Sequence, residues 1–261
     1  MLIHGDVSDR WRLGMHMLHS ASELGYAPST LNLARLGWTV AGKNKKAITS
    51  SLLFQKADAR FKKLVQMRQD PNALTLQGLI YESKRQNDLA LTAFSTAERV
   101  GARVAQSRPQ QTQISSQDEK KTTESQGEED NEPMAPTVRP KRWDWEPSYF
   151  LGQGRIYLKQ GRRRAAENSF RSAALELDNA EGYLALAQLL PKDSPQREEY
   201  LTKAAISGVT EACGLLAEIE REKAAQPDID REQVQVHDRL AREWSNLAGV
   251  TSQAADAAAS P

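Results

Sequence analysis

The chain has 261 residues, of which 39% are apolar and 26% charged, and its formal net charge is +1. This length and composition fit one large or two ordinary globular domains with an adequate core. The near-zero charge excludes a global field that steers the protein toward nucleic acid or membrane, so any such binding must be local. The single cysteine, Cys213, excludes an intrachain disulfide framework and a four-cysteine zinc site.

The sequence carries no targeting or membrane signal that we recognise. It has no run of about 18 apolar residues, which predicts no membrane insertion. The first twenty residues include Asp6 and Asp9 and lack a secretory apolar core or the acid-poor character of a transit peptide. We therefore expect a cytoplasmic protein. The alternatives are a nuclear one, if the basic cluster from Arg139 to Arg142 acts as an import signal, and a mitochondrial one, if a leader precedes Met1.

Apolar periodicity and turn signals predict helices throughout the chain, and no strand pattern competes with them. The dipeptides Asp70-Pro71, Asp178-Asn179 and Ser194-Pro195 mark helix starts. The predicted helices cover residues 9–24, 28–42, 45–68, 72–85, 87–101, 146–160, 162–177, 180–190, 195–207, 209–225 and 229–247. The fold class that follows is all-α.

Two stretches share a five-residue pattern. Gly78, Tyr81, Ala90, Phe94 and Ala97 recur 76 positions later as Gly154, Tyr157, Ala166, Phe170 and Ala173. In a helical hairpin the Gly lets a neighbouring helix come close and the Tyr ring covers it, while the two alanines and the Phe form the apolar stripe of the second helix. Gly161 lies between the two helices and supplies the stop. Such hairpins have too little core to stand alone, so neighbours must stack.

These residues resemble the tetratricopeptide repeat, whose unit has 34 residues. Leu74 and Phe150 stand where that family has a Trp, and the closing Pro is absent. A second pattern, from Arg197 to Glu222, resembles the join between two units of the related Sel-like repeats. The segment from Ser20 to Gly37 repeats this join, with Gly25 answering to Gly208 and Leu33 to Leu216. The resemblance implies a right-handed α/α solenoid of helical hairpins.

The helix from Trp11 to Leu24 resembles the second helix of a Sel-like hairpin, but almost no chain precedes it. Either a non-helical stub covers its open face, or the natural start lies upstream of Met1. The segment from Ala105 to Pro140 is rich in polar residues and Pro, which predicts a disordered loop. The predicted organisation is N-terminal helical repeats over 1–104, a disordered acidic and polar insert over 105–145, C-terminal helical repeats over 146–248, and a flexible tail over 249–261.

Several residues suggest chemistry, each with a structural alternative. His16 and His19, with Glu23 one turn on, could bind a metal, but a solvated helix face is the interpretation we favour. Cys213 could be a nucleophile, but a buried small residue fits its place better. The stretch Gly152-Gln153-Gly154 lies inside a predicted helix, so it is no dinucleotide loop. We therefore predict no metal, no cofactor and no catalytic residue.

Two basic clusters suggest nucleic acid instead. Arg139, Lys141 and Arg142 stand beside Trp143 and Trp145, which could stack on single-stranded nucleic acid; alternatively, both rings dock on the helices where the insert rejoins them. Arg162, Arg163 and Arg164 form the second cluster, at a hairpin turn. With Arg155 and Lys159 they could make one positive surface, and a solvated turn is the alternative.

The repeat resemblance implies a concave face, lined by the first helix of each hairpin, that binds a partner polypeptide. The candidate residues for this face are Thr75, Leu79, Glu82, Leu151, Arg155, Leu158 and Lys159. Thr75 and Leu79, and Leu151 and Arg155, stand where chaperone-binding relatives carry a Lys and an Asn, so capture of chaperone tails is doubtful. We expect a non-enzymatic scaffold or assembly adaptor. The alternatives are an RNA-binding helical-repeat protein and, least supported, an enzyme built on the solenoid.

Stability should follow the repeat logic. Phe170→Ala is expected to cost about 3–5 kcal/mol, as for a large core truncation, whereas deletion of residues 105–140 should cost little. Urea unfolding of both variants checks this. A deletion that unfolds the protein as thoroughly as Phe170→Ala would make the insert a structural element.

Overall fold

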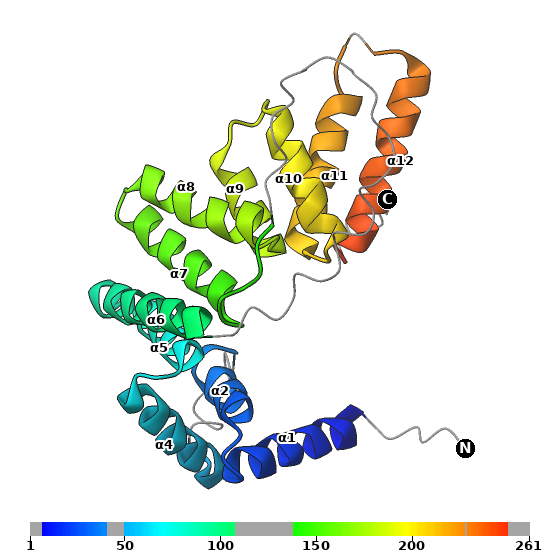
Figure 1. Ribbon diagram of the computed structural model, residues 1–261. Helices are drawn as coiled ribbons and strands as arrows, with labels where there is room; N and C mark the ends of the chain where they lie inside the picture. Colours follow the sequence, from blue (N-terminus) through cyan, green and yellow to red (C-terminus); the bar gives the residue numbers. More distant parts are fainter. Residues whose placement is uncertain (1–6, 41–49, 108–137, 228, 250–261) are drawn as a thin grey trace, which may run out of the picture. The chain divides into compact units, whose positions relative to one another are not determined.

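The computed structural model describes residues 7–40, 50–107, 138–227 and 229–249, and these form eleven α-helices (Figure 1). No strand occurs in the described residues, so the all-α prediction is confirmed. The chain divides into two compact units. The first comprises Met1–Met134 and Lys141–Ile156, and the second comprises Ala135–Pro140 and Tyr157–Pro261.

The first unit consists of helices that pack mainly against their neighbours in sequence. Its helices are α1 (Val7–Glu23), α2 (Ala27–Arg35), α4 (Leu52–Met67), α5 (Pro71–Ser83), α6 (Asn87–Ser107) and most of α7 (Glu146–Lys159). A π-helical turn, η1 (Leu36–Val40), extends α2. Two side chains cap helix starts, since Ser51 accepts from the Phe54 amide and Asp70 from the Asn72 amide. The Asp70-Pro71 start is therefore confirmed.

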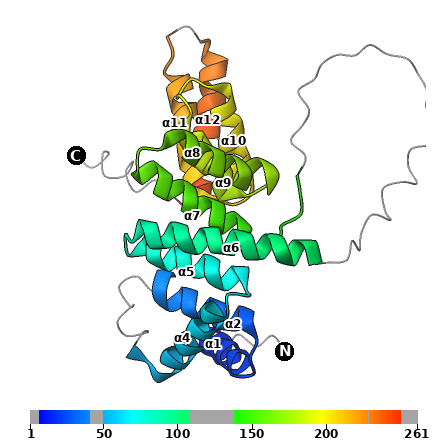
Figure 2. The same cartoon turned by 60° about the vertical axis from the view of Figure 1, so that its left-hand side comes forward.

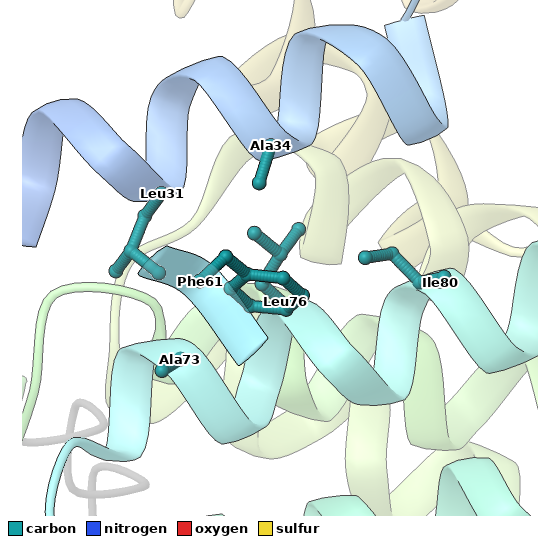
Figure 3. Close-up of a cluster of buried hydrophobic side chains, with 6 residues drawn as sticks. All are labelled: Leu31, Ala34, Phe61, Ala73, Leu76 and Ile80. Atoms are coloured by element: carbon teal, nitrogen blue, oxygen red, sulfur yellow. The ribbon is translucent and has the colours of Figure 1, made fainter. Parts of the chain in front are cut away.

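A cluster of buried side chains joins α2, α4 and α5 (Figure 3). Leu31 and Ala34 come from α2, Phe61 from α4, and Leu76 and Ile80 from α5. Burying several large aliphatic and aromatic side chains stabilises a fold by about 1.5–3 kcal/mol each. This cluster fixes α2 in place and thereby positions the helix pair α1–α2.

The hairpin of α5 and α6 contains the first copy of the sequence pattern, and the two helices lie side by side in both views (Figures 1 and 2). Gly78, Ala90, Phe94 and Ala97 are buried. A Cβ atom at Gly78 would lie 2.4 Å from the Phe94 ring, so only glycine fits there. The close approach at Gly78 is observed, but the Phe94 ring fills the space beside it, whereas the sequence pattern assigned this cover to Tyr81.

The second unit also packs in sequence-adjacent pairs. Its helices are α8 (Arg163–Arg171), the π-helical turn η3 (Ser172–Glu176), α9 (Ala180–Leu189), α10 (Pro195–Ile206), α11 (Thr210–Ala224) and α12 (Arg231–Leu247). α9 packs against α8 and α10, and α11 packs against α10 and α12. From the second copy of the pattern, Ala166, Phe170 and Ala173 are buried in this unit.

Four helices end in the same turn. After α7, the Arg162 amide donates to the Tyr157 carbonyl and the Gly161 amide to the Leu158 carbonyl, with Gly161 at φ +73°. The same bond pair closes α1 at Gly25, α5 at Arg85 and α10 at Gly208. This is the Schellman motif, which needs a left-handed residue at its centre. The stop assigned to Gly161 is confirmed, and the paired joins at Gly25 and Gly208 have the same backbone geometry.

The interval 105–145, predicted as disordered, differs at both ends. α6 continues to Ser107, about two turns beyond its predicted end, and within residues 138–145 the side chains of Trp143 and Trp145 pack on helices. The remainder, 108–137, lies outside the described residues, as does the tail from 250. The predicted helix over 45–68 begins at Leu52 in the structure, and part of its predicted first turns is also outside the description.

The turn at Arg85 gives a matched test of backbone strain, because Arg85 holds φ +61° with a side chain and Gly161 holds φ +73° without one. A Cβ at Gly161 has open space, so Gly161→Ala should cost about 1 kcal/mol through left-handed strain alone. Arg85→Ala should change stability by less than about 0.5 kcal/mol, since its backbone already bears a Cβ. Equal losses in urea unfolding would contradict this account.

Candidate functional site

The predicted concave-face residues are largely used in packing within the first unit. Thr75 is fully buried, donates to the Pro71 carbonyl at 2.7 Å and accepts from the Trp143 indole at 3.2 Å. Leu151 is buried, and Leu79 lies 3.1 Å from the place of a Cβ at Gly152. These three side chains therefore support helix packing and do not offer an open groove.

Glu82 and Arg155 pair with each other. Arg155 donates from Nε to Oε1 and from Nη2 to Oε2 of Glu82, both at 2.8 Å, so the guanidinium and the carboxylate meet edge to edge. Glu82 is buried and the Arg155 side chain is 43% exposed. A bidentate pair of this kind orients both groups and neutralises the local charge. Leu158 and Lys159, the other exposed members of the predicted set, lie at the end of α7.

The basic cluster of the RNA hypothesis is similarly engaged. Arg162 lies over the Tyr157 ring, with 4.5 Å between the guanidinium carbon and the ring centroid. Arg163 donates to the Leu189 carbonyl at the carboxyl end of α9. Together with the Arg155 pair, these contacts assign a structural role to three of the five cations. Arg162, Arg163 and Arg164 are nevertheless exposed residues at a helix start.

The two tryptophans that precede α7 dock on the first unit. Trp143 is 3% exposed, and a Cβ atom at Gly101 would lie 2.2 Å from its ring. The Trp145 amide donates to the Asn72 side chain at 3.0 Å. Arg142 donates to the fully buried Glu146 carboxylate through its amide and its guanidinium. The docking interpretation is therefore confirmed for Trp143, whose ring is not available for stacking on bases.

The histidine pair lies beside an arginine rather than within a ligand set. His16 and His19 line a shallow hollow of about 360 Å³ together with Arg12 and Glu23. Burial, and then the charge of Arg60, hold the pKa of His19 below its usual value of 6.5. In the part of the chain that is described, no group of three His, Cys, Asp or Glu side chains could hold a metal. Cys213 is buried, as expected.

Three further titratable groups with shifted pKa values, Tyr183, Glu220 and Lys223, form structural contacts in the second unit. Burial and the hydrogen bond to Asp178 raise the pKa of Tyr183 to about 12, so this phenol stays protonated. Glu220 on α11 accepts from Lys223 at 3.0 Å and lies 2.6 Å from His237 Nδ1 on α12. Lys223 also donates to Glu198 on α10 at 2.7 Å. This network ties three helices together.

An open apolar surface lies between α1 and α2. It is a groove of about 630 Å³ whose walls come from both helices. Trp11 and Met17, on α1, are 59% and 62% exposed. The lining residues are Arg10, Trp11, Gly14, Met15, Met17, Leu18 and Ala21 from α1, then Tyr26, and Ser29, Asn32 and Leu36 from α2 and η1. Large apolar side chains gathered in a groove mark a binding surface more often than scattered ones do.

Sequence reasoning named none of these groove residues as a binding site. The signal was present as the uncovered face of the helix from Trp11 to Leu24, since Trp11, Gly14, Leu18 and Ala21 recur at helical spacing. Periodicity alone cannot tell a core stripe from an exposed one. Only the packing shows that this stripe keeps an open side.

No protein-family model matches the chain, and the searches of curated proteins and of solved structures find no match either. No helix among the described residues is long and apolar enough to cross a membrane.

The network at Glu220 predicts a pH-dependent contribution to stability. Burial alone raises the pKa of Glu220, but hydrogen bonds from His237 and Lys223 outweigh it and hold that pKa below 4.5. A lowered carboxyl pKa stabilises the fold above the unfolded value, and the gain is lost as the pH falls through the folded value. Glu220→Gln should lower the unfolding free energy by about 1–3 kcal/mol at neutral pH.

The same substitution should matter less in acid. At about pH 3, below the usual carboxyl pKa, the difference between wild type and Glu220→Gln should be smaller than at neutral pH, because the stabilisation by the ionised carboxyl is lost as the pH falls toward its lowered pKa. Urea unfolding at both pH values measures the difference. A loss that is equal at the two pH values would assign the effect to packing rather than to charge.

Proposed function

We propose that this protein is a non-enzymatic scaffold or assembly adaptor that binds a partner polypeptide. The observation that carries the proposal is the apolar groove between α1 and α2, where Trp11 and Met17 stay more than half exposed. Burial of such side chains in a complex contributes the hydrophobic free energy that drives association. The hairpin construction also supports it, since solenoids of hairpins present extended surfaces to other chains.

The side-chain contacts within the first unit leave little of the predicted concave face free to bind a partner polypeptide. Thr75 and Leu151 are buried, and Glu82 and Arg155 neutralise each other, so the proposed binding surface moves to α1 and α2. The RNA-binding alternative has less support, because Arg155, Arg162 and Arg163 already have partners in the fold. The proposal includes the repeat family: the helical hairpins resemble tetratricopeptide and Sel-like repeats, and they would form a solenoid of that kind.

Affinity purification of the tagged full-length chain from its native host tests the function. Wild type is compared with Trp11→Glu, and Ile206→Glu serves as the control because Ile206 is also exposed, at 76%, but lies on α10. A defined set of proteins should be recovered with wild type and with the control, lost with Trp11→Glu, and retained after nuclease treatment. Recovery that depends on RNA, or no reproducible protein at all, would contradict the adaptor function.

A further inference from the structure

We propose that the groove between α1 and α2 binds an amphipathic α-helix of a partner protein, antiparallel to α1, in the place that α9 holds beside α10. The inference rests on the proposed function, because it names the kind of polypeptide that the groove takes. It comes from comparing two helix pairs of this chain, α1–α2 in the first unit and α10–α11 in the second.

The two pairs have corresponding geometry. Gly25 and Gly208 hold φ +88° and +90° and close the same Schellman turn. The second helix of each pair then buries equivalent residues, with Leu33 and Leu216 both 2% exposed. Residues 183 positions apart thus occupy the same place in their helix pair, so the surroundings of α10 indicate what the equivalent face of α1 is shaped to accept.

The first helix of each pair differs in its surroundings. α10 packs against α9 as well as α11, the Tyr200 and Tyr183 rings are 5.8 Å apart, and Leu201 and Ala204 are fully buried. These three α10 positions correspond to Met17, Leu18 and Ala21 on α1. Met17 is 62% exposed, and Leu18 and Ala21 are only partly buried.

The difference has a clear location. α1 packs on α2 and α4. Met17, Leu18 and Ala21 all line the groove between α1 and α2. In the described residues, therefore, the side of α1 that corresponds to the α9-facing side of α10 has an apolar surface and no helix over it.

The groove fits a short helix in length and shape. α9 has ten residues and is about 15 Å long, and the lining positions of α1 from Arg10 to Ala21 span about 17 Å. Gly14 lies in the middle of this stretch with open space beside it. A helix backbone can therefore approach α1 closely there, as helices do where small residues meet.

Charge sets the direction and the kind of helix. Arg10 is the only charged side chain among the described residues that line the groove. An antiparallel partner helix brings its carboxyl end, which carries a partial negative charge, toward Arg10. In the second unit the carboxyl end of α9 also accepts from an arginine, although this Arg163 lies on α8 rather than on α10. The occupant is thus a neutral or acidic helix with an apolar stripe, and α9 itself carries Glu181 as its one charge.

Fluorescence polarisation with the full-length chain tests the inference. The probe is a labelled synthetic peptide of residues 178–191, which contains α9, and a peptide of the same composition in scrambled order is the control. Saturable binding of the first peptide alone is expected. Met17→Glu should weaken it at least tenfold and Met17→Gln to a lesser degree, whereas Ile206→Glu should leave it unchanged. Circular dichroism checks that each variant is folded.

Each other result overturns the inference. It fails if the peptide does not bind, or binds Met17→Glu as well as it binds wild type. If sedimentation shows a dimer that Met17→Glu dissociates, the occupant is a second copy. If a chain without residues 250–261 binds the peptide more tightly, the chain's own tail is the occupant. If Trp11→Glu loses the natural partners in the affinity purification but the α9 peptide does not bind, the helix inference is wrong and the proposed adaptor function is still supported.

Discussion

Close approach through glycine is the constraint on which the packing of both units depends. In the first unit the Phe94 ring occupies the space that a Cβ would take at Gly78 and at Gly152, so one aromatic side chain joins α5, α6 and α7. In the second unit a Cβ at Gly182 would lie 2.7 Å from the backbone nitrogen of Ala174, which brings α9 onto η3. Any larger residue would push these helices apart, because close-packed interiors leave no slack for an extra carbon.

The segment that leads into α7 is also held by an aromatic ring packed beside a glycine. The indole of Trp143 occupies the space beside Gly101, makes an edge contact with Tyr149 and donates to Thr75. The Trp143 ring thus connects α5, α6 and α7. The buried Glu146 carboxylate accepts a hydrogen bond from the Arg142 guanidinium. A residue that composition alone marks as a nucleic-acid contact is therefore an anchor, since an aromatic ring gains more from burial than from exposure.

Helical hairpins of this size cannot bury both faces by themselves, so every face needs a neighbour. α10 has helices on both sides, and its inward residues are fully buried. Among the described residues, α1 has apolar residues at the equivalent positions but an open side, and its large apolar side chains remain accessible. The proposed adaptor function and the proposed binding of a partner helix both rest on this imbalance between apolar surface and the helices that cover it.

The sequence by itself determined the helices, their order and their stops. The spacing of Gly78, Tyr81, Ala90, Phe94 and Ala97 predicted a hairpin, because helical period is a local property. Gly25, Gly161 and Gly208 marked the ends of three other helices, because a left-handed backbone favours glycine. The left-handed turn at Arg85 was not predicted from the sequence, because the residue at its centre is not a glycine.

Only the tertiary structure decided which side chains are covered. It showed that Thr75 and Leu151 are buried, that Arg155 neutralises Glu82, and that the open groove lies at α1 and α2. The physical reason is that exposure is set by which helix faces meet, and those contacts join residues such as Thr75 and Trp143 that are far apart in the chain. Periodicity reports that a stripe is apolar, and packing alone determines whether the stripe is a core or a binding surface.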